Sequence, residues 1–169
     1  KHNRRGNPRN KMNPRIKIFN AKETRKVLRA LNQQFGIEEI PGQLIRKGEE
    51  KLFLFQGNLD KETIKALEEF TPIERAGVYV AKEVGDVLRL SIEGSQIFKD
   101  QITKNVVELT EEEKETWMMG YEVEKKTGLR DFVIIKYKDE MLGTGRASEE
   151  KITNFIPKSR RLKDKNIEN

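Results

Sequence analysis

The sequence predicts an α+β protein of two units, with a small helix-and-hairpin domain at residues 15–71 and a strand-rich domain at residues 72–163. Helical apolar spacing and a hairpin pattern mark the first unit, whereas short β-branched runs dominate the second. Pro72 disfavours helix at Thr71, which makes this dipeptide the expected boundary. A chain of 169 residues has room for one domain or two small ones.

The first unit is expected to begin with a short strand at residues 15–19. Apolar residues recur at helical spacing through residues 22–35, and Gly36 ends the pattern, which predicts an amphipathic helix. Residues 43–46 and 51–55 are typical of two strands joined by a tight turn. A second helix, residues 59–70 with Asp60 as its cap, completes the order helix, hairpin, helix.

The second unit is expected to open with a hairpin of residues 77–81 and 87–90. Ser91 can then cap a short helix at residues 92–98. Gly94 lies inside this helix, where glycine is less favourable than alanine by roughly 1 kcal/mol. Its presence indicates close approach by another backbone or by a ligand.

A strand at residues 104–109 leads to a helix whose start is marked by the capping box Thr110–Glu113. In a capping box the hydroxyl and the carboxylate each accept a hydrogen bond from a backbone N–H that the helix leaves unpaired. Trp117 follows in this helix and is expected to anchor the core, in preference to serving as a base-stacking platform.

The closing stretch has the most distinctive pattern in the chain. The apolar run 132–135 suits a buried strand, and a second short strand is expected to run into a glycine-rich turn at Gly143-Thr144-Gly145-Arg146. A third strand at residues 152–156 ends at Pro157, and the basic run 158–161 follows. A glycine turn beside cations exposes N–H donors and positive side chains, which suits a phosphate backbone. By spacing alone, the glycines equally fit a tight turn or a bulge with no ligand.

Positive charge is concentrated at the two ends of the chain. Residues 1–17 hold seven Lys or Arg and no acid, and residues 158–163 hold four more, so the rest of the chain sums to −5 within a net charge of +6. This distribution indicates polyanion binding. Residues 1–14 are expected to form a basic disordered arm, which either orders on nucleic acid or is an ordinary unstructured end. Residues 164–169 are expected to be a frayed tail.

Composition excludes several protein classes. With no cysteine, the chain has neither a disulfide framework nor a thiolate metal site, and a cytoplasmic location is expected. No apolar run approaches the roughly 20 residues of a membrane span. High Lys and Glu content is compatible with a thermophilic source.

Catalytic and cofactor patterns are missing from the expected folded part. The single histidine is His2, in the arm, so no Ser-His-Asp triad, Cys-His pair or histidine zinc site can be assembled. The chain has no phosphate-binding P-loop sequence, and Gly143–Gly145 lacks the third glycine of a dinucleotide fingerprint. The carboxylate clusters Glu111–Glu113 and Glu149-Glu150 suit a helix start and a turn. We therefore expect a protein that is not an enzyme, with no cofactor and no metal.

The order of these motifs resembles a PUA domain, a small RNA-binding barrel, over about residues 73–163. The likeness is strongest to PUA domains associated with Nop/Sun-type RNA cytosine methyltransferases of archaea and bacteria. The segments that carry it are Gly77–Val80, Leu90–Gly94, Lys104–Leu109, Val133–Tyr137, Leu142–Gly145 and Asn154–Arg161. The resemblance implies a PUA-like mixed β-barrel after a small α+β N-terminal domain, a plan similar to ribosome-biogenesis factors with a pre-PUA domain.

In PUA domains the glycine-containing loop beside the first helix faces RNA, so the resemblance implies RNA-binding roles for a set of residues. They are Lys82, Ser91, Gly94, Ser95, Gly143, Thr144, Gly145 and Arg146. Charge adds the basic run and the arm to the candidates. These are Lys158, Arg160, Arg161, Arg4, Arg5 and Arg9.

The leading hypothesis is a non-catalytic protein that binds structured RNA, either rRNA or tRNA, in ribosome biogenesis, ribosome association or RNA modification. The alternative is a protein-binding specificity subunit that recruits an RNA methyltransferase. The Pro-Cys motifs expected of a Nop/Sun catalytic domain are absent, as they must be without cysteine. Methyl transfer would therefore come from another chain or another part of a longer one.

Overall fold

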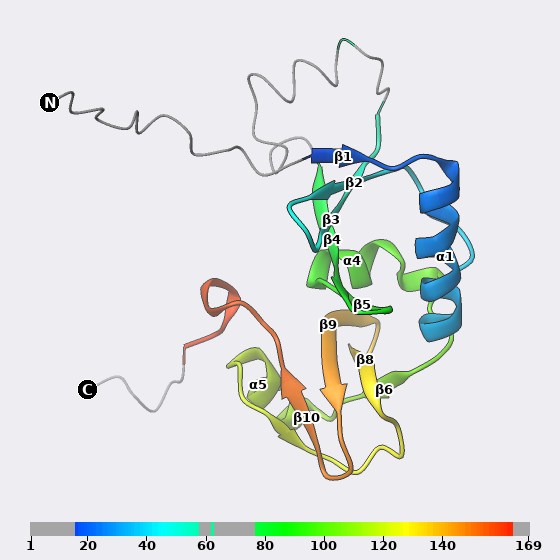
Figure 1. Cartoon of the computed structure of the whole chain (residues 1–169). Helices are drawn as coiled ribbons and strands as arrows, with labels where there is room; N and C mark the ends of the chain where they lie inside the picture. Colours follow the sequence, from blue (N-terminus) through cyan, green and yellow to red (C-terminus); the bar gives the residue numbers. More distant parts are fainter. Residues whose placement is uncertain (1–15, 58–61, 63–76, 164–169) are drawn as a thin grey trace, which may run out of the picture.

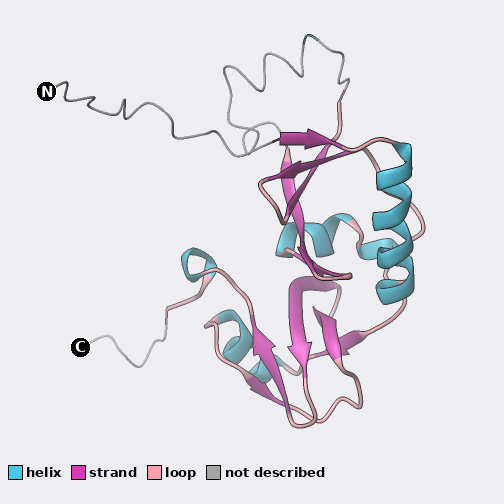
Figure 2. Cartoon of the chain, viewed as in Figure 1, coloured by secondary structure: helices cyan, strands magenta, loops and turns pink. Residues whose placement is uncertain are grey.

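The computed structural model describes residues 16–57, 62 and 77–163 of the chain. Two five-stranded sheets form the frame, with strand orders β1-β2-β3-β4-β5 and β6-β8-β9-β10-β7. Figure 2 shows helices beside both sheets and one short helix where the sheets meet. The α+β class predicted from the sequence is confirmed. No helix among the described residues is long and apolar enough to cross a membrane.

The first sheet is antiparallel throughout. Its strands are β1 (Ile16–Ile18), β2 (Gln43–Lys47), β3 (Lys51–Phe55), β4 (Val78–Val84) and β5 (Val87–Leu90). The predicted strand near residues 15–19 and the two predicted hairpins are thus confirmed. β3 pairs with β4, so strands from either side of the expected boundary at Thr71-Pro72 share one sheet. The boundary itself lies outside the described residues.

Helix α1 (Ala21–Phe35) covers one face of this sheet, as Figure 1 shows. Asn20 begins it with a capping box to Glu23, and Gly36 ends it in the left-handed conformation at φ 80°. Three apolar side chains one turn apart are buried, and they pack in the same core cluster as Leu52 and Leu90 of the sheet. These side chains are Val27, Leu31 and Phe35. The helix predicted over residues 22–35 is confirmed.

The second sheet combines one parallel pair with antiparallel neighbours. Its strands are β6 (Val106–Glu108), β7 (Val123–Glu124), β8 (Asp131–Tyr137), β9 (Glu140–Ala147) and β10 (Lys151–Asn154). Helix α5 (Glu111–Met118) begins at the predicted capping box of Thr110 and Glu113. Trp117 is fully buried and donates a 3.0 Å hydrogen bond from Nε1 to the Leu142 carbonyl, which confirms its role as a core anchor.

Helix α4 (Ile92–Ile97) lies between the two sheets and contacts both β4 and β9. A Cβ atom at Gly94 would lie 2.0 Å from the Val80 carbonyl oxygen, so only glycine permits this packing. The Ser95 hydroxyl accepts a 3.1 Å hydrogen bond from the Gly143 N–H of β9. The close approach predicted at Gly94 is therefore to another backbone.

The glycine-rich turn predicted at Gly143-Thr144-Gly145-Arg146 is wrong, because these residues lie within strand β9. The pairing of β8 with β9 shifts register between Ile134 and Lys136, and Gly143 has φ +88°. Glycine tolerates a bulge and a turn equally well. Here Gly143 lies in a bulge, and its N–H donates a hydrogen bond to the Ser95 hydroxyl instead of to strand β8.

Several boundaries differ from those predicted. The expected strands at 104–109 and 152–156 are shorter, and the basic run forms the 3-10 helix η2 (Lys158–Arg160) after Pro157. A further 3-10 helix, η1 (Lys99–Gln101), follows α4. The predicted helix at 59–70, the arm at 1–14 and the tail at 164–169 lie outside the described residues.

Replacing Gly94 by alanine should destabilise the protein by at least about 2 kcal/mol, because the new methyl group meets a backbone oxygen that cannot move aside. The free energy of unfolding in urea measures this. Gly48→Ala is the control, since no atom lies within 4 Å of a Cβ there and only its φ of +67° is unfavourable, by about 1 kcal/mol. Equal losses in the two variants would contradict the packing role of α4.

Candidate nucleic-acid interface

A groove of about 100 Å³ lies where the two sheets meet, between the start of α4, strand β9 and residues 155–160. We call it the α4 groove. Its walls combine two aromatic rings, two arginines and the backbone of the β9 bulge. It is lined by Tyr79, Arg89, Leu90, Ser91, Ile92, Glu93, Leu142, Gly143, Thr144, Phe155, Ile156, Pro157 and Arg160. Segments far apart in sequence thus bring four of the predicted site residues together: Ser91, Gly143, Thr144 and Arg160.

Thr144 is the unusual residue of the α4 groove. It is 4% exposed, and its Oγ1 atom has no hydrogen-bond partner within the described part of the chain. A buried hydroxyl without a partner costs about 1–3 kcal/mol relative to a satisfied one. The groove therefore contains one polar group whose hydrogen-bonding capacity is unused by the fold.

The other small predicted residues position the groove through contacts within the protein. Ser91 caps α4 by accepting from the Gly94 N–H at 2.9 Å, and its hydroxyl donates to the Tyr79 carbonyl at 2.6 Å. Ser95 is fully buried and donates to the Ile92 carbonyl at 2.7 Å. Gly145 is also buried, where a Cβ would lie 2.9 Å from the Trp117 ring.

Two residues of the groove were missed by the sequence analysis, Arg89 and Phe155. The Arg89 guanidinium lies 4.4 Å from the centre of the Phe155 ring, and Phe155 meets Phe132 edge-on at 6.0 Å between ring centres. Arg146 lies over the other side of this pair, 5.5 Å from the Phe132 ring centre. The two aromatic rings therefore hold a cation at each end, which orders both side chains before any ligand arrives.

Arg160 forms an ion pair with Glu93 at the mouth of the groove. Partial burial would raise the pKa of the Glu93 carboxyl, but the hydrogen bond from Arg160 and a backbone N–H outweigh it and lower that pKa. Glu93 is therefore ionised at neutral pH and holds the Arg160 guanidinium in place. Both side chains remain accessible, at 39% and 48% exposed.

The remaining predicted cations have different surroundings. Arg161 donates from Nε to the Ile156 carbonyl at 3.0 Å and packs against Gly120, so it fastens the closing segment to the end of α5. Lys158 is exposed on η2. Lys82 forms a 3.2 Å ion pair with Glu50, outside the groove lining. Arg4, Arg5 and Arg9 lie outside the described residues.

Strand register connects Lys82 to the groove. Lys47 pairs with Lys51, Lys51 with Lys82, and Lys82 with Arg89, so four cations stand directly opposite one another across β2, β3, β4 and β5. Directly opposed residues share one face of a sheet, and like charges in this arrangement are unfavourable. This sheet row, as we call the four residues, ends at Arg89 in the α4 groove. Among the described residues, no group of three or more His, Cys, Asp or Glu could hold a metal ion.

Comparison with known proteins bears on this interface directly. Residues 104–162 match the family model described as the methyltransferase RsmF PUA domain. The chain is also similar to "Ribosomal RNA small subunit methyltransferase F" of Psychromonas ingrahamii, at 25% identity over 140 residues. The aligned part is 79% of this chain but 28% of the relative, so the chain spans under a third of that protein.

These similarities confirm the resemblance to a PUA domain of an RNA methyltransferase and the PUA-like barrel expected in the second unit. The relative is bacterial, and it gives no support to an archaeal or thermophilic source.

Glu93→Gln should reduce the loss of thermal stability between pH 7 and pH 3. Because the folded-state pKa of Glu93 is lowered from 4.5, its stabilising contribution is complete above that value and is lost as the pH falls through the folded value. The pair is largely exposed, so the difference in Tm should be small, about 1–2 °C. Glu149→Gln, an exposed carboxylate in a turn, is the control. If Tm of the Glu93→Gln variant fell with pH as steeply as Tm of the wild type, the Glu93–Arg160 ion pair would have no stabilising role.

Proposed function

We propose that this chain binds structured RNA through the α4 groove and the adjoining sheet row, without itself catalysing a reaction on the RNA. The observation that carries this proposal is the unpartnered Thr144 hydroxyl, which lies in a groove bordered by Arg89 and Arg160. A contact that served only to join the two sheets would need neither a hydroxyl without a hydrogen-bond partner nor the two arginines. The match to an RNA methyltransferase PUA domain supports RNA as the ligand.

Each part of the surface has a role in this binding. Arg89, Arg160 and the lysines of the sheet row contact phosphates, and thereby set affinity and orientation without reading sequence. The Thr144 hydroxyl hydrogen-bonds to a phosphate oxygen or a ribose 2′-OH that enters the groove. Recognition of a folded RNA through shape, 2′-OH and phosphate contacts is the mode expected of such a surface.

Ribosomal RNA is the favoured partner, with tRNA second. The similar protein from Psychromonas ingrahamii is named as a methyltransferase of small-subunit ribosomal RNA, and this chain aligns with 28% of it. We infer that the chain supplies RNA binding to rRNA modification or ribosome biogenesis in the cytoplasm. Methyl transfer, where it occurs, belongs to residues beyond those in this sequence or to a partner enzyme, and no cofactor binds here.

Thr144→Val tests the groove, because it keeps the shape of the side chain and removes only the hydroxyl. The free protein should keep or gain thermal stability, since an unpaired buried hydroxyl is lost, while affinity for the preferred RNA should fall about 2–10-fold. Differential scanning fluorimetry and fluorescence anisotropy measure the two effects. Thr153→Val on the neighbouring strand β10 is the control and should leave both unchanged. Unchanged RNA affinity for Thr144→Val would remove the groove from the binding surface.

The double variant Arg89→Gln/Arg160→Gln should flatten the salt dependence of RNA binding. Each lost phosphate contact lowers the magnitude of the log-log slope by about 0.7–0.9, so we expect a decrease of about 1.4–1.8. Binding of rRNA fragments and of tRNA over a salt series measures the slope. Lys126→Gln/Arg130→Gln, two exposed cations in the loops of the second sheet, is the control for net charge. Equal slopes in all proteins would favour the alternative of a protein-docking subunit.

A further inference from the structure

The exposed face of α1 carries a cationic ridge that the proposed groove does not use. Lys22, Arg25, Lys26 and Arg29 are all exposed and follow the spacing i, i+3, i+4, i+7. This spacing places them on one side of a helix, over about 10 Å of its length, opposite the buried side chains. We call these four residues the α1 ridge.

Within the described residues, no ion pair neutralises the ridge. None of its four side chains makes an ion pair or hydrogen bond with any part of the chain that the structure describes. The single acid of α1, Glu23, is already engaged with Lys17 and with the Asn20 N–H. Glu83 pairs with Arg46, and neither Glu38 nor Asp86, which line the hollows beside the ridge, forms an ion pair with a ridge residue among the described residues.

This arrangement is unfavourable for the helix itself. Lys22 and Lys26, like Arg25 and Arg29, are like charges at i, i+4, which repel on a helix surface. Three of the four, Lys22, Arg25 and Lys26, lie in the N-terminal half of α1, with Lys22 in the first turn, and the last turn holds no basic residue. The helix dipole disfavours cations near the N-terminus and favours them at the C-terminus. The ridge therefore lowers the stability of the helix, and we take this cost as an indication of an external anionic partner.

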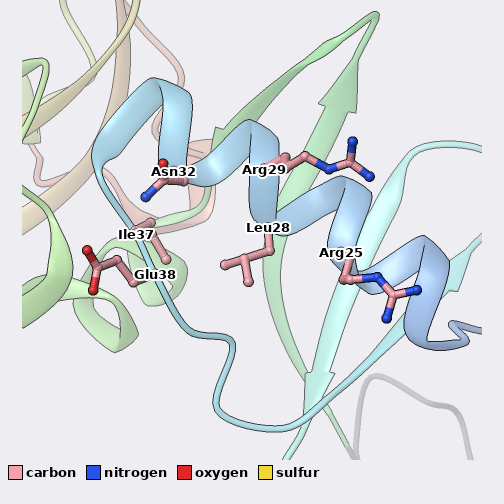
Figure 3. Close-up of a pocket in the computed structure, with 6 residues that line it drawn as sticks. All are labelled: Arg25, Leu28, Arg29, Asn32, Ile37 and Glu38. Atoms are coloured by element: carbon pink, nitrogen blue, oxygen red, sulfur yellow. The ribbon is translucent and has the colours of Figure 1, made fainter.

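Hollows flank the ridge on both sides. One, of about 390 Å³, lies between α1 and residues 37–38 and is lined by Leu28, Ile37 and Asn32 beside Arg25 and Arg29. Figure 3 shows Leu28 directed toward Ile37, while the two guanidinium groups extend on the side away from Glu38. The other, of about 490 Å³, is bordered by Lys26, Arg29 and Arg46. A chain with phosphates along it can follow such a ridge while its sugars rest in the hollows.

We propose that the α1 ridge is a second phosphate-binding surface for RNA, separate from the α4 groove. This inference rests on the proposed function, since both surfaces would contact the same RNA. Figure 1 shows α1 and the segment before η2 on opposite sides of the molecule. Register agrees, because Leu52, Ala81 and Leu90 point to the core shared with α1, whereas the alternating Lys51, Lys82 and Arg89 point the other way. The protein therefore holds two segments of a folded RNA, one on each side of the first sheet.

The test compares matched pairs of charge removals in the whole chain. Lys26→Gln/Arg29→Gln should lower the magnitude of the salt slope for binding an rRNA fragment by about 1.4–1.8, as expected for two lost phosphate contacts. Lys126→Gln/Arg130→Gln removes one lysine and one arginine as well and should leave the slope unchanged. Tm of the ridge variant should be equal to or above that of the wild type, because repulsion is relieved.

The groove variant Arg89→Gln/Arg160→Gln, measured in parallel, separates this inference from the proposed function. A flatter slope in the ridge variant and in the groove variant supports both surfaces. A flatter slope in the groove variant alone overturns the second surface and leaves the groove in place. A flatter slope in the ridge variant alone supports the ridge and overturns the groove. An equal decrease of the slope in the ridge variant and in the control variant would mean that only overall charge matters, which also overturns the ridge.

Discussion

The arrangement of this protein depends on the close contact of helix α4 with the two sheets. Gly94 brings the helix backbone against the Val80 carbonyl, and Ser95 accepts the one N–H that the β9 bulge withdraws from its ladder. Polar groups buried where two sheets meet at a helix nearly always find a hydrogen-bond partner. Among the described residues at this junction, the Thr144 hydroxyl is the exception, and it lines the groove that the junction creates. The fold and the candidate interface thus have a common origin.

Secondary structure was largely predictable from the sequence, because it rests on local signals. Caps at Ser91 and Thr110, the stop at Gly36 and the period of α1 each act within a few residues. The glycines of β9 were misjudged for a related reason. Gly143 reaches φ +88° in a bulge as easily as in a turn, and only the pairing with β8 decides between them.

The candidate interface was predictable only in part. Thr144 was named through family resemblance and Arg160 through the charge of the basic run, whereas Arg89 looked like an ordinary polar residue in an alternating strand. Its importance comes from Phe155, 66 positions away, which fixes its guanidinium. The sheet row depends on strand register, and the α1 ridge depends on the lack of ion-pair partners among the described residues; composition reveals neither. Arg161 illustrates the reverse case, since a basic residue in a cationic run serves mainly to fasten the chain.

The strand order of the second sheet also bears on how the protein is made. β6 pairs only with β8, and β7 only with β10, within the described part of the chain. Each of these strands therefore leaves the ribosome before its partner has been synthesised. The ends of the long intervening segment must come together before the two strands can pair. β9 and residues 155–160 complete the α4 groove, so it is assembled late, after the first sheet and α1 can already have formed. A nascent chain would accordingly acquire its α1 side before its groove side.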